Sequence, residues 1–200
     1  MRIPRHLGII PDGNRRWAKK SELDKEKGYE HGLTPGLNLF RSARKLGIEE
    51  LTYYGFTVDN CKRPAAQVKA FQKACVDAVR LIEQEDVSLF VIGNTDSKFF
   101  PKELLPYTRN REANTTKMKV NFLVNYGWDW DLKNGFRSKT ISRIDMIIRW
   151  GGMCRLSGFL PLQSVYADFY IIPDMWPEYR EEQFNEAIAW YQRQDVTLGG

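Results

Sequence analysis

Three polar elbows, each directly after a short apolar run, contain the residue types that could do chemistry in this chain. They are Asp12 to Arg16, Asp59 to Arg63 and Arg149 to Ser157. Each elbow contains arginine, whose planar guanidinium fits two phosphate oxygens at once, and two of the elbows contain glycine. An aspartate among such arginines would be repelled by a phosphate unless a divalent cation, most naturally Mg²⁺, lies between them. These residues therefore predict a diphosphate and Mg²⁺ site with a second anion site nearby.

The elements that must position these elbows alternate between strand-like and helix-like patterns. Strands are expected at 7–10, 50–57, 87–93, 119–126, 145–149 and 169–173, and helices from residue 15 onward and at 35–46, 65–85, 98–113 and 181–194. This alternation is typical of α/β proteins, so we expect a mostly parallel six-stranded sheet with helices on both faces. Ligands of such sheets bind beyond the carboxyl ends of the strands, so the three elbows should converge on one edge.

The composition indicates one globular domain over residues 1–200. With 42% hydrophobic and 13% aromatic residues, a chain of 200 residues can bury a full core. The net charge of +5 favours an anionic partner. That excess is modest beside the charge of a dedicated nucleic-acid binder, so no nucleic-acid partner is expected.

The cysteines and histidines argue against disulfides and zinc. Cys61, Cys75 and Cys154 are odd in number and lack CxxC spacing, and the only histidines are His6 and His31. This pattern is typical of a reducing compartment, so we expect a cytoplasmic protein. The chain shows no signal-peptide core and no run of about 18 apolar residues that could span a membrane.

At these elbows the chain resembles the cis-prenyltransferases of the undecaprenyl diphosphate synthase type. The stretches that resemble the four family signatures are 6–18, 56–64, 125–127, and 149–168 followed by Trp176-Pro177. They occur in the family order and cover nearly the whole chain. The resemblance implies a homodimeric enzyme of isoprenoid biosynthesis with a hydrophobic tunnel. It would ionise an allylic diphosphate and join its carbon, with cis geometry, to an acceptor that is normally isopentenyl diphosphate.

The resemblance also implies roles for individual residues. Those expected to bind the allylic diphosphate are Gly13, Asn14, Arg15, Arg16, Trp17, Lys25, Tyr29 and Arg63. Those expected to bind the acceptor diphosphate are Arg149, Arg155 and Ser157. Asp12 would bind Mg²⁺, with Asp168 as a second acidic residue near the metal. Asp12 and Asn60 are the expected catalytic residues, with Asn60 organising proton removal and Trp17 near the reacting carbons. Phe71 and Cys75 would line the tunnel.

Several departures from the family pattern bear on the reaction. Met153 and Cys154 stand where an acidic and a polar residue are usual, and Lys25 and Tyr29 stand where arginine and histidine are usual. Cys61 replaces an aromatic residue, the region from 131 to 149 is short, and the helix after the second elbow ends early. A shorter helix along the tunnel predicts products with shorter isoprenoid chains. Relatives with a similarly altered last signature couple two allylic diphosphates head to middle or prenylate an unusual acceptor.

The leading hypothesis is therefore a prenyltransferase that makes a short or irregular isoprenoid diphosphate, with isopentenyl or dimethylallyl diphosphate as acceptor. Its partners would be allylic and homoallylic prenyl diphosphates, a second copy of the chain, and a membrane surface if products are long. The alternatives are a non-catalytic or partner-dependent subunit of a heteromeric enzyme, prenyl transfer to a non-isoprenoid acceptor, and a small RNA-binding protein. The plainer interpretations also stay open, with the first elbow as only a turn, Trp17 as packing and Asp168 as an interface residue.

Overall fold

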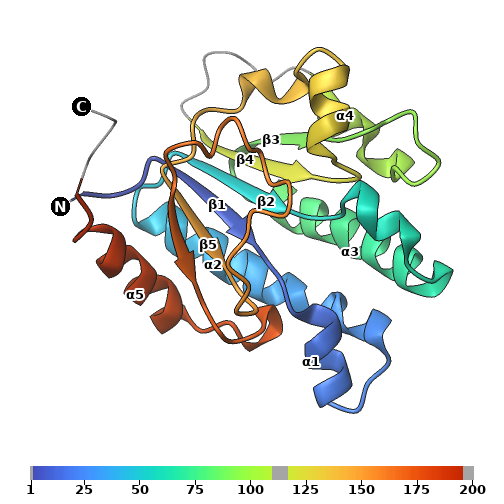
Figure 1. The fold of residues 1–200 in the computed structure, drawn as a ribbon, viewed down its shortest axis with the longest axis horizontal. Coiled ribbons are helices and arrows are strands. Elements are labelled where there is room, and N and C mark those ends of the chain that lie inside the picture. The colour runs from blue at the N-terminus through green and yellow to red at the C-terminus, as the bar shows by residue number, and fades with distance from the viewer. Residues whose placement is uncertain (1, 110–116, 196–200) are drawn as a thin grey trace.

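Six parallel strands form a single sheet in the computed structural model, which describes residues 2–109 and 117–195. The strands are β1 (His6–Ile10), β2 (Glu50–Tyr54), β3 (Val87–Ile92), β4 (Met118–Leu123), β5 (Met146–Arg149) and β6 (Asp168–Ile171). Their spatial order is β3-β4-β2-β1-β5-β6, and every neighbouring pair is parallel (Figure 1). The predicted six-stranded α/β sheet is confirmed.

The helices lie between these strands, mostly where the sequence placed them. The α-helices are α1 (Asn14–Lys20), α2 (Leu33–Lys45), α3 (Ala65–Glu83), α4 (Trp128–Lys133) and α5 (Glu181–Tyr191). Short 3-10 helices are η1 (Lys25–Gly28), η2 (Glu30–Gly32), η3 (Val58–Lys62), η4 (Lys102–Thr108), η5 (Arg137–Thr140) and η6 (Trp176–Glu178). No helix in the described part of the chain combines the length and apolarity needed to cross a membrane.

The helix expected at 98–113 is wrong in type and extent. Its place is taken by η4, which has Pro106 inside it, and proline cannot donate the backbone hydrogen bond that an α-helix interior requires. Residues 110–113 of the expected helix lie outside the described residues.

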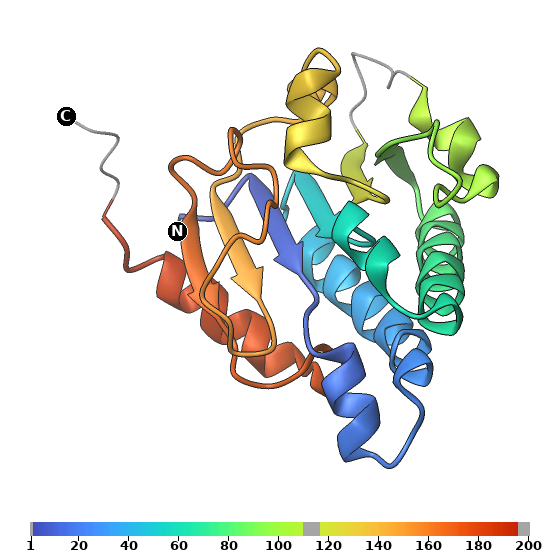
Figure 2. The same ribbon diagram turned by 45° about the vertical axis from the view of Figure 1, so that its right-hand side comes forward.

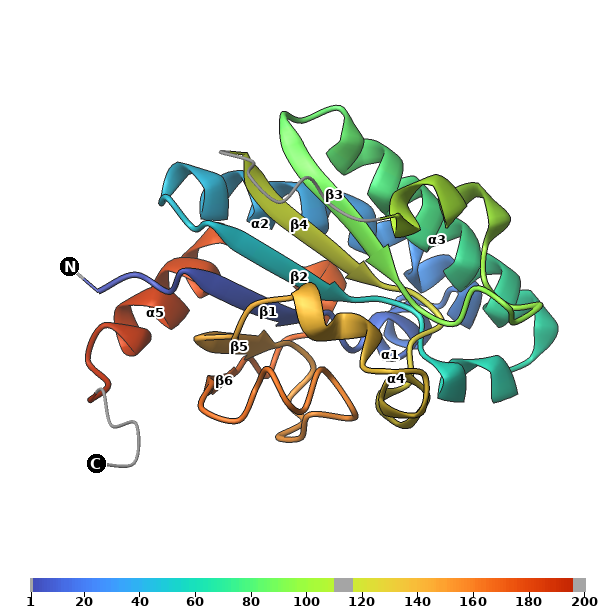
Figure 3. The same ribbon diagram turned by 90° about the horizontal axis from the view of Figure 1, so that it is seen from above.

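The two faces of the sheet are covered differently (Figure 3). Helices α2, α3 and α5 pack on one face, where Phe40, Val79 and Phe184 belong to the larger buried cluster. A smaller cluster on the other face includes Phe159 and Leu160, with cover from α4, η5 and the irregular segment 150–167. Helices therefore flank the sheet as expected, although those on the second face, α4 and η5, are short.

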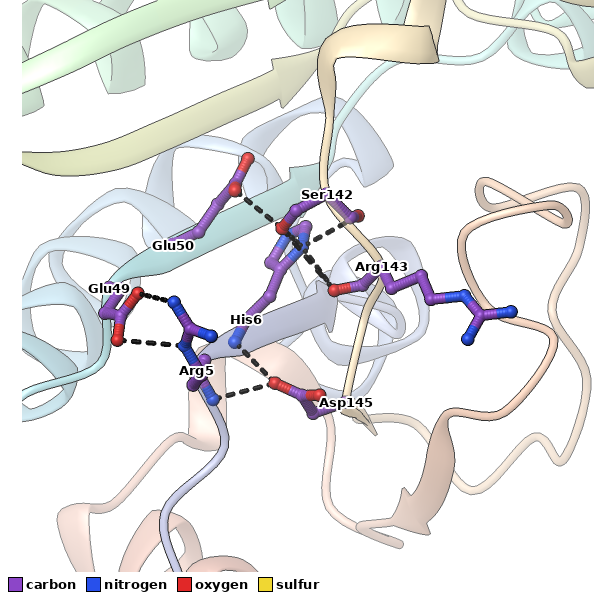
Figure 4. A network of polar contacts seen from close by, with 7 residues as sticks. All are labelled: Arg5, His6, Glu49, Glu50, Ser142, Arg143 and Asp145. Carbon is purple, nitrogen blue, oxygen red and sulfur yellow. Dashed lines mark hydrogen bonds and ion pairs between the residues drawn. The ribbon is translucent and has the colours of Figure 1, made fainter. Parts of the chain in front are cut away.

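A buried polar network lies at the amino ends of the central strands (Figure 4). His6 Nε2 is 2.8 Å from Thr52 Oγ1, and its Nδ1 is 3.1 Å from Ser142 Oγ. Ser142 Oγ donates to Glu50 Oε2 at 2.8 Å, and Asp145 Oδ2 accepts from the backbone N–H of His6 at 2.9 Å. The network ties the segment before β5 to β1 and β2. Figure 2 shows that α1 begins at the carboxyl ends of the strands, on the side of the sheet opposite to this network.

Burial of His6 predicts a loss of stability in acid. Desolvation lowers the pKa of His6 below its usual value of 6.5, so the unfolded chain binds a proton more readily than the folded one. The stability that the neutral ring contributes is therefore present above about pH 6.5 and is lost as the pH falls through the lowered folded-state value. We expect His6→Gln to lower the free energy of unfolding at pH 7.5 but to flatten its decline down to pH 5, as measured by urea denaturation. Parallel declines in the two proteins would contradict this role of His6.

Candidate active site

The first elbow connects β1 to α1 through a turn that only glycine fits. Gly13 has φ of 104°, and a side-chain Cβ there would lie 2.8 Å from Met175 Cβ. Asn14 Nδ2 donates to the Pro11 carbonyl at 2.8 Å, which closes the turn. Asn14 Oδ1 is buried and has no hydrogen-bond donor among the described residues. The turn thus holds Asp12 at the carboxyl end of β1.

An ion pair joins the first elbow to the third. Asp12 Oδ2 accepts from Arg149 Nη2 at 2.8 Å, and Arg16 Nη2 lies 3.6 Å from the same oxygen. The Arg149 side chain is only 4% exposed, and its Nη1 donates to the Arg155 carbonyl and, at 2.9 Å, to Ser157 Oγ. Its Nε is buried with no partner in the described part of the chain. The guanidinium is thus fixed between the two elbows.

The second elbow is a 3-10 turn that is closed by its own side chains. Thr57 Oγ1 accepts from the Asn60 backbone N–H at 3.3 Å, and Asn60 Oδ1 accepts from the Thr57 backbone N–H at 3.0 Å. Because Asn60 uses its oxygen in this capping box, its amide nitrogen is the group that can meet a ligand. Arg63, at the end of the elbow, donates from Nη1 to the Tyr29 hydroxyl at 2.9 Å.

Two adjoining cavities lie at this edge of the sheet. The polar pocket has a volume of about 570 Å³, and its charged lining residues are Arg15, Arg16, Lys19, Lys25, Arg63, Arg149 and Arg155 with Asp12 and Asp59. The apolar cavity, of about 80 Å³, lies between α2, α3 and the sheet, and Phe71 and Cys75 line it as expected for a tunnel. Residues that line both spaces are Pro11, Asn14, Tyr29, Tyr54, Gly55 and Phe71. The arrangement suits a ligand with a strongly anionic head and a short apolar tail.

Nearly all the predicted site residues meet in the polar pocket. Those that line it are Asp12, Gly13, Asn14, Arg15, Arg16, Lys25, Tyr29, Asn60, Arg63, Arg149, Arg155 and Ser157. Sequence reasoning missed Lys19, which also lines the pocket. Its position four residues after Arg15 was the available signal, because residues at that spacing share one face of a helix.

Trp17 is not part of either cavity lining. Its ring packs against His31, with the two ring centroids 4.6 Å apart. The side chain is half-buried on the face of α1 turned away from Arg15 and Lys19. Trp17 therefore packs against a neighbouring element, as in the plainer interpretation of the sequence, and lies outside the pocket lining.

Asp168 lies at the amino ends of the strands, whereas the pocket lies at their carboxyl ends. It is the first residue of β6 and aligns with Met146, the first residue of β5, whereas Arg149 is the last residue of that strand. The Asp168 carboxylate accepts from Arg2 Nη2 at 3.3 Å. Because parallel strands start at one edge and end at the other, the expectation that Asp168 and Asp12 share a metal is wrong within one chain.

The carboxylates of the pocket suit a metal ion that arrives with its ligand. No group of three or more acidic, histidine or cysteine side chains within residues 2–109 and 117–195 could enclose a metal. Asp12, with 35% of its side chain exposed, can supply one carboxylate. Mg²⁺ is commonly held by one or two carboxylates together with substrate phosphates. Asp12 therefore fits as the protein ligand of a Mg²⁺ diphosphate complex.

Two further groups, Tyr54 in the pocket lining and Cys61 in the second elbow but outside that lining, stay neutral at physiological pH. Burial raises the pKa of Tyr54, whose hydroxyl donates to the Ser157 carbonyl at 2.7 Å. Burial also raises the pKa of the Cys61 thiol, which lies 3.4 Å from Asn125 Oδ1. A thiol with a raised pKa is a poor nucleophile, so Cys61 is a structural residue and the negative charge of the pocket comes from its aspartates.

The buried guanidinium of Arg149 predicts that Asp12 contributes to stability as well as to binding. We expect Asp12→Ala to lower the free energy of unfolding by about 1 to 3 kcal/mol, because a buried charge loses its charged partner. Asp59→Ala is the matched control, since Asp59 lines the same pocket but pairs with Lys62 in solvent, and the expected change is below about 1 kcal/mol. Equal losses in guanidinium denaturation would contradict the role of the ion pair.

Comparison with known proteins agrees with this geometry. The profile of the family described as putative undecaprenyl diphosphate synthase matches residues 10–142 and 133–199. One relative is a ditrans,polycis-undecaprenyl-diphosphate synthase of Vibrio parahaemolyticus, described as (2E,6E)-farnesyl-diphosphate specific. It is 30% identical to this chain, and the alignment covers 98% of this chain and 91% of that protein. An isoprenyl transferase of Neisseria gonorrhoeae is also 30% identical, and the alignment covers 98% of this chain and 90% of that protein.

A solved structure shares the fold over the full length. The crystal structure of lavandulyl diphosphate synthase from Lavandula x intermedia, in complex with dimethylallyl diphosphate, superposes with a TM-score of 0.82. The alignment covers 99% of each chain at 22% sequence identity. With the family profile, the curated relatives and the sheet topology in agreement, the chain belongs to the undecaprenyl diphosphate synthase family of cis-prenyltransferases, which transfer prenyl groups.

Proposed function

We propose that this protein binds an allylic prenyl diphosphate in the polar pocket, ionises it with Mg²⁺ and couples it to a second isoprenoid diphosphate. The observation that carries the proposal is the wall shared by a pocket with seven basic side chains and an apolar cavity. A prenyl diphosphate has the matching shape and charge. The small volume of the apolar cavity favours a short-chain product.

The donor half of the pocket would hold the leaving diphosphate. Arg15 Nη1 donates to Gln67 at 3.3 Å, and Arg16 Nη2 donates to the Gly151 carbonyl at 2.8 Å, so both guanidinium groups are already positioned. As the carbon–oxygen bond breaks, negative charge grows on the diphosphate, and fixed cations stabilise that charge without reorganising. Mg²⁺ bound with the diphosphate at Asp12 would add positive charge at the same place.

The acceptor half would be built around the fixed guanidinium of Arg149. Arg155 and Ser157 line the same side of the pocket and could take the remaining diphosphate oxygens. Met153 also lines it, so an exposed thioether stands where relatives usually carry a carboxylate. The lavender enzyme was solved with dimethylallyl diphosphate, which supports a five-carbon allylic diphosphate as one substrate of this chain and irregular head-to-middle coupling as one outcome. Asn60 would organise the proton removal that completes the coupling.

A second copy of the chain would cover an exposed apolar surface. Its large side chains lie on α4 and in the segment 150–167, on the face of the sheet away from α2 and α3, and they are Trp128, Leu132, Leu162, Val165 and Tyr166. Exposed groups of this kind often mark interfaces. This surface supports the homodimer that the family resemblance implies.

The reaction can be tested with a panel of donors. Purified protein with Mg²⁺ would be incubated with dimethylallyl, geranyl, farnesyl or geranylgeranyl diphosphate, each with and without isopentenyl diphosphate. We expect release of diphosphate and one short product, favoured by the shortest donor and abolished by a chelator. Mass spectrometry of the product distinguishes regular from irregular coupling.

Two outcomes of this panel would point elsewhere. No diphosphate release with any donor, in the presence of Mg²⁺, would contradict the proposed reaction. Turnover only after addition of a second, different prenyltransferase chain would favour the partner-dependent subunit instead.

Neighbouring lysines on α1 give a matched test of the donor pocket. Lys19 lines the pocket, whereas Lys20 donates to Glu178 at 3.1 Å outside it. We expect Lys19→Ala to raise KM for the allylic diphosphate about three- to tenfold through loss of one charge, equivalent to about 0.7 to 1.4 kcal/mol. Lys20→Ala should leave KM within about twofold, a change of about 0.4 kcal/mol. Similar KM values for the two variants in steady-state assays would place the diphosphate elsewhere.

A further inference from the structure

Tyr29 stands at the junction of the polar pocket and the apolar cavity. Its side chain lines both spaces and is only 5% exposed. The backbone before it packs closely against the start of α1, since a Cβ on Gly28 would lie 2.1 Å from the Asn14 carbonyl oxygen. Because the ring lines both spaces, an apolar tail that passes from the pocket into the cavity passes beside it.

Contacts on both sides hold the ring in place. The Tyr29 hydroxyl accepts from Arg63 Nη1 at 2.9 Å. The ring stacks on Phe71 of α3, with centroids 4.4 Å apart and planes 7° from parallel. Phe71 in turn meets Phe56 edge to face, with centroids 5.4 Å apart. Tyr29 directly follows η1, Phe56 and Arg63 flank η3, and Phe71 lies on α3, so the three rings and the guanidinium connect these parts of the chain across the junction.

The space behind this stack is small. The apolar cavity of about 80 Å³ is roughly half of the 150 Å³ cavity that accommodates benzene in another protein. It can take about one five-carbon unit, so a tail of three such units would have to displace the stacked rings. The stack is thus in a position to select by tail length.

We propose that the Tyr29 ring, stacked on Phe71, sets the length of the allylic donor and restricts it to short tails. This inference rests on the proposed function and adds a residue outside α3 to the walls that limit chain length. Removal of the ring widens the passage between the pocket and the cavity and leaves space along α3 for a longer tail. Removal of the hydroxyl alone leaves that wall standing.

The test measures binding without turnover. Unreactive thiodiphosphate analogues of dimethylallyl and farnesyl diphosphate would be titrated calorimetrically into the wild-type protein, Tyr29→Ala and Tyr29→Phe, all with Mg²⁺. The wild-type protein should bind the five-carbon analogue more tightly. Tyr29→Ala should shift the ratio of the two Kd values at least about tenfold toward the farnesyl analogue, because the longer tail gains buried apolar contact. Tyr29→Phe should weaken both analogues alike and keep the wild-type ratio.

Each result bears on a defined claim. An unchanged Kd ratio in a folded Tyr29→Ala protein, or a Tyr29→Phe ratio that shifts as far as that of Tyr29→Ala, would overturn the role of the ring. Should Tyr29→Ala fail to fold by circular dichroism, Tyr29→Leu removes the stacked ring and leaves part of its volume free, and a smaller shift of the Kd ratio in the same direction is expected. Failure of the wild-type protein to bind either analogue would instead contradict the proposed function on which the inference rests.

Discussion

The ion pair between Asp12 and Arg149 is the interaction on which the rest of the site depends. It joins the ends of two adjacent strands, β1 and β5, and it places a buried guanidinium at the centre of the edge where the elbows meet. A buried charge is tolerated only when it is paired and hydrogen-bonded, so Ser157 and the Arg155 carbonyl are drawn in around it. Together with the hydrogen bond from Arg16 to the Gly151 carbonyl, this contact holds the first and third elbows at a fixed separation.

Near that ion pair the charged side chains and the apolar side chains line two separate spaces, the polar pocket and the apolar cavity. The basic side chains come mainly from elbows at the carboxyl ends of the strands, whereas the apolar cavity lies between the sheet and the amphipathic helices α2 and α3. Both spaces exist because the strands are parallel, which gathers their carboxyl ends at one edge, and because the long helices pack on the same face. The fold itself thus places a charged space next to an apolar one, which is the arrangement that an amphipathic ligand requires.

Much of this could be predicted from the sequence, and the failures have physical reasons. Apolar runs that end in Asp, Gly, Asn and Arg identified the strands and the elbows, since turn chemistry is local. The direction of Trp17 depends on packing against His31 of another element, which no local pattern reveals. Asp168 was misplaced because a motif gives the identity of a residue but not the end of the strand at which it lies. The stack of Tyr29 on Phe71 joins residues far apart in the chain and needed the fold to be seen.

The polar network around His6 lies at the strand ends remote from the pocket, and this separation has a consequence for how the protein can diverge. Groups that share no partners and lie well apart contribute to stability almost independently. Substitutions that reshape the pocket for another substrate can therefore accumulate at one edge while the opposite edge keeps the sheet folded. One scaffold can in this way carry different pockets, because the two ends of its strands are free to change separately.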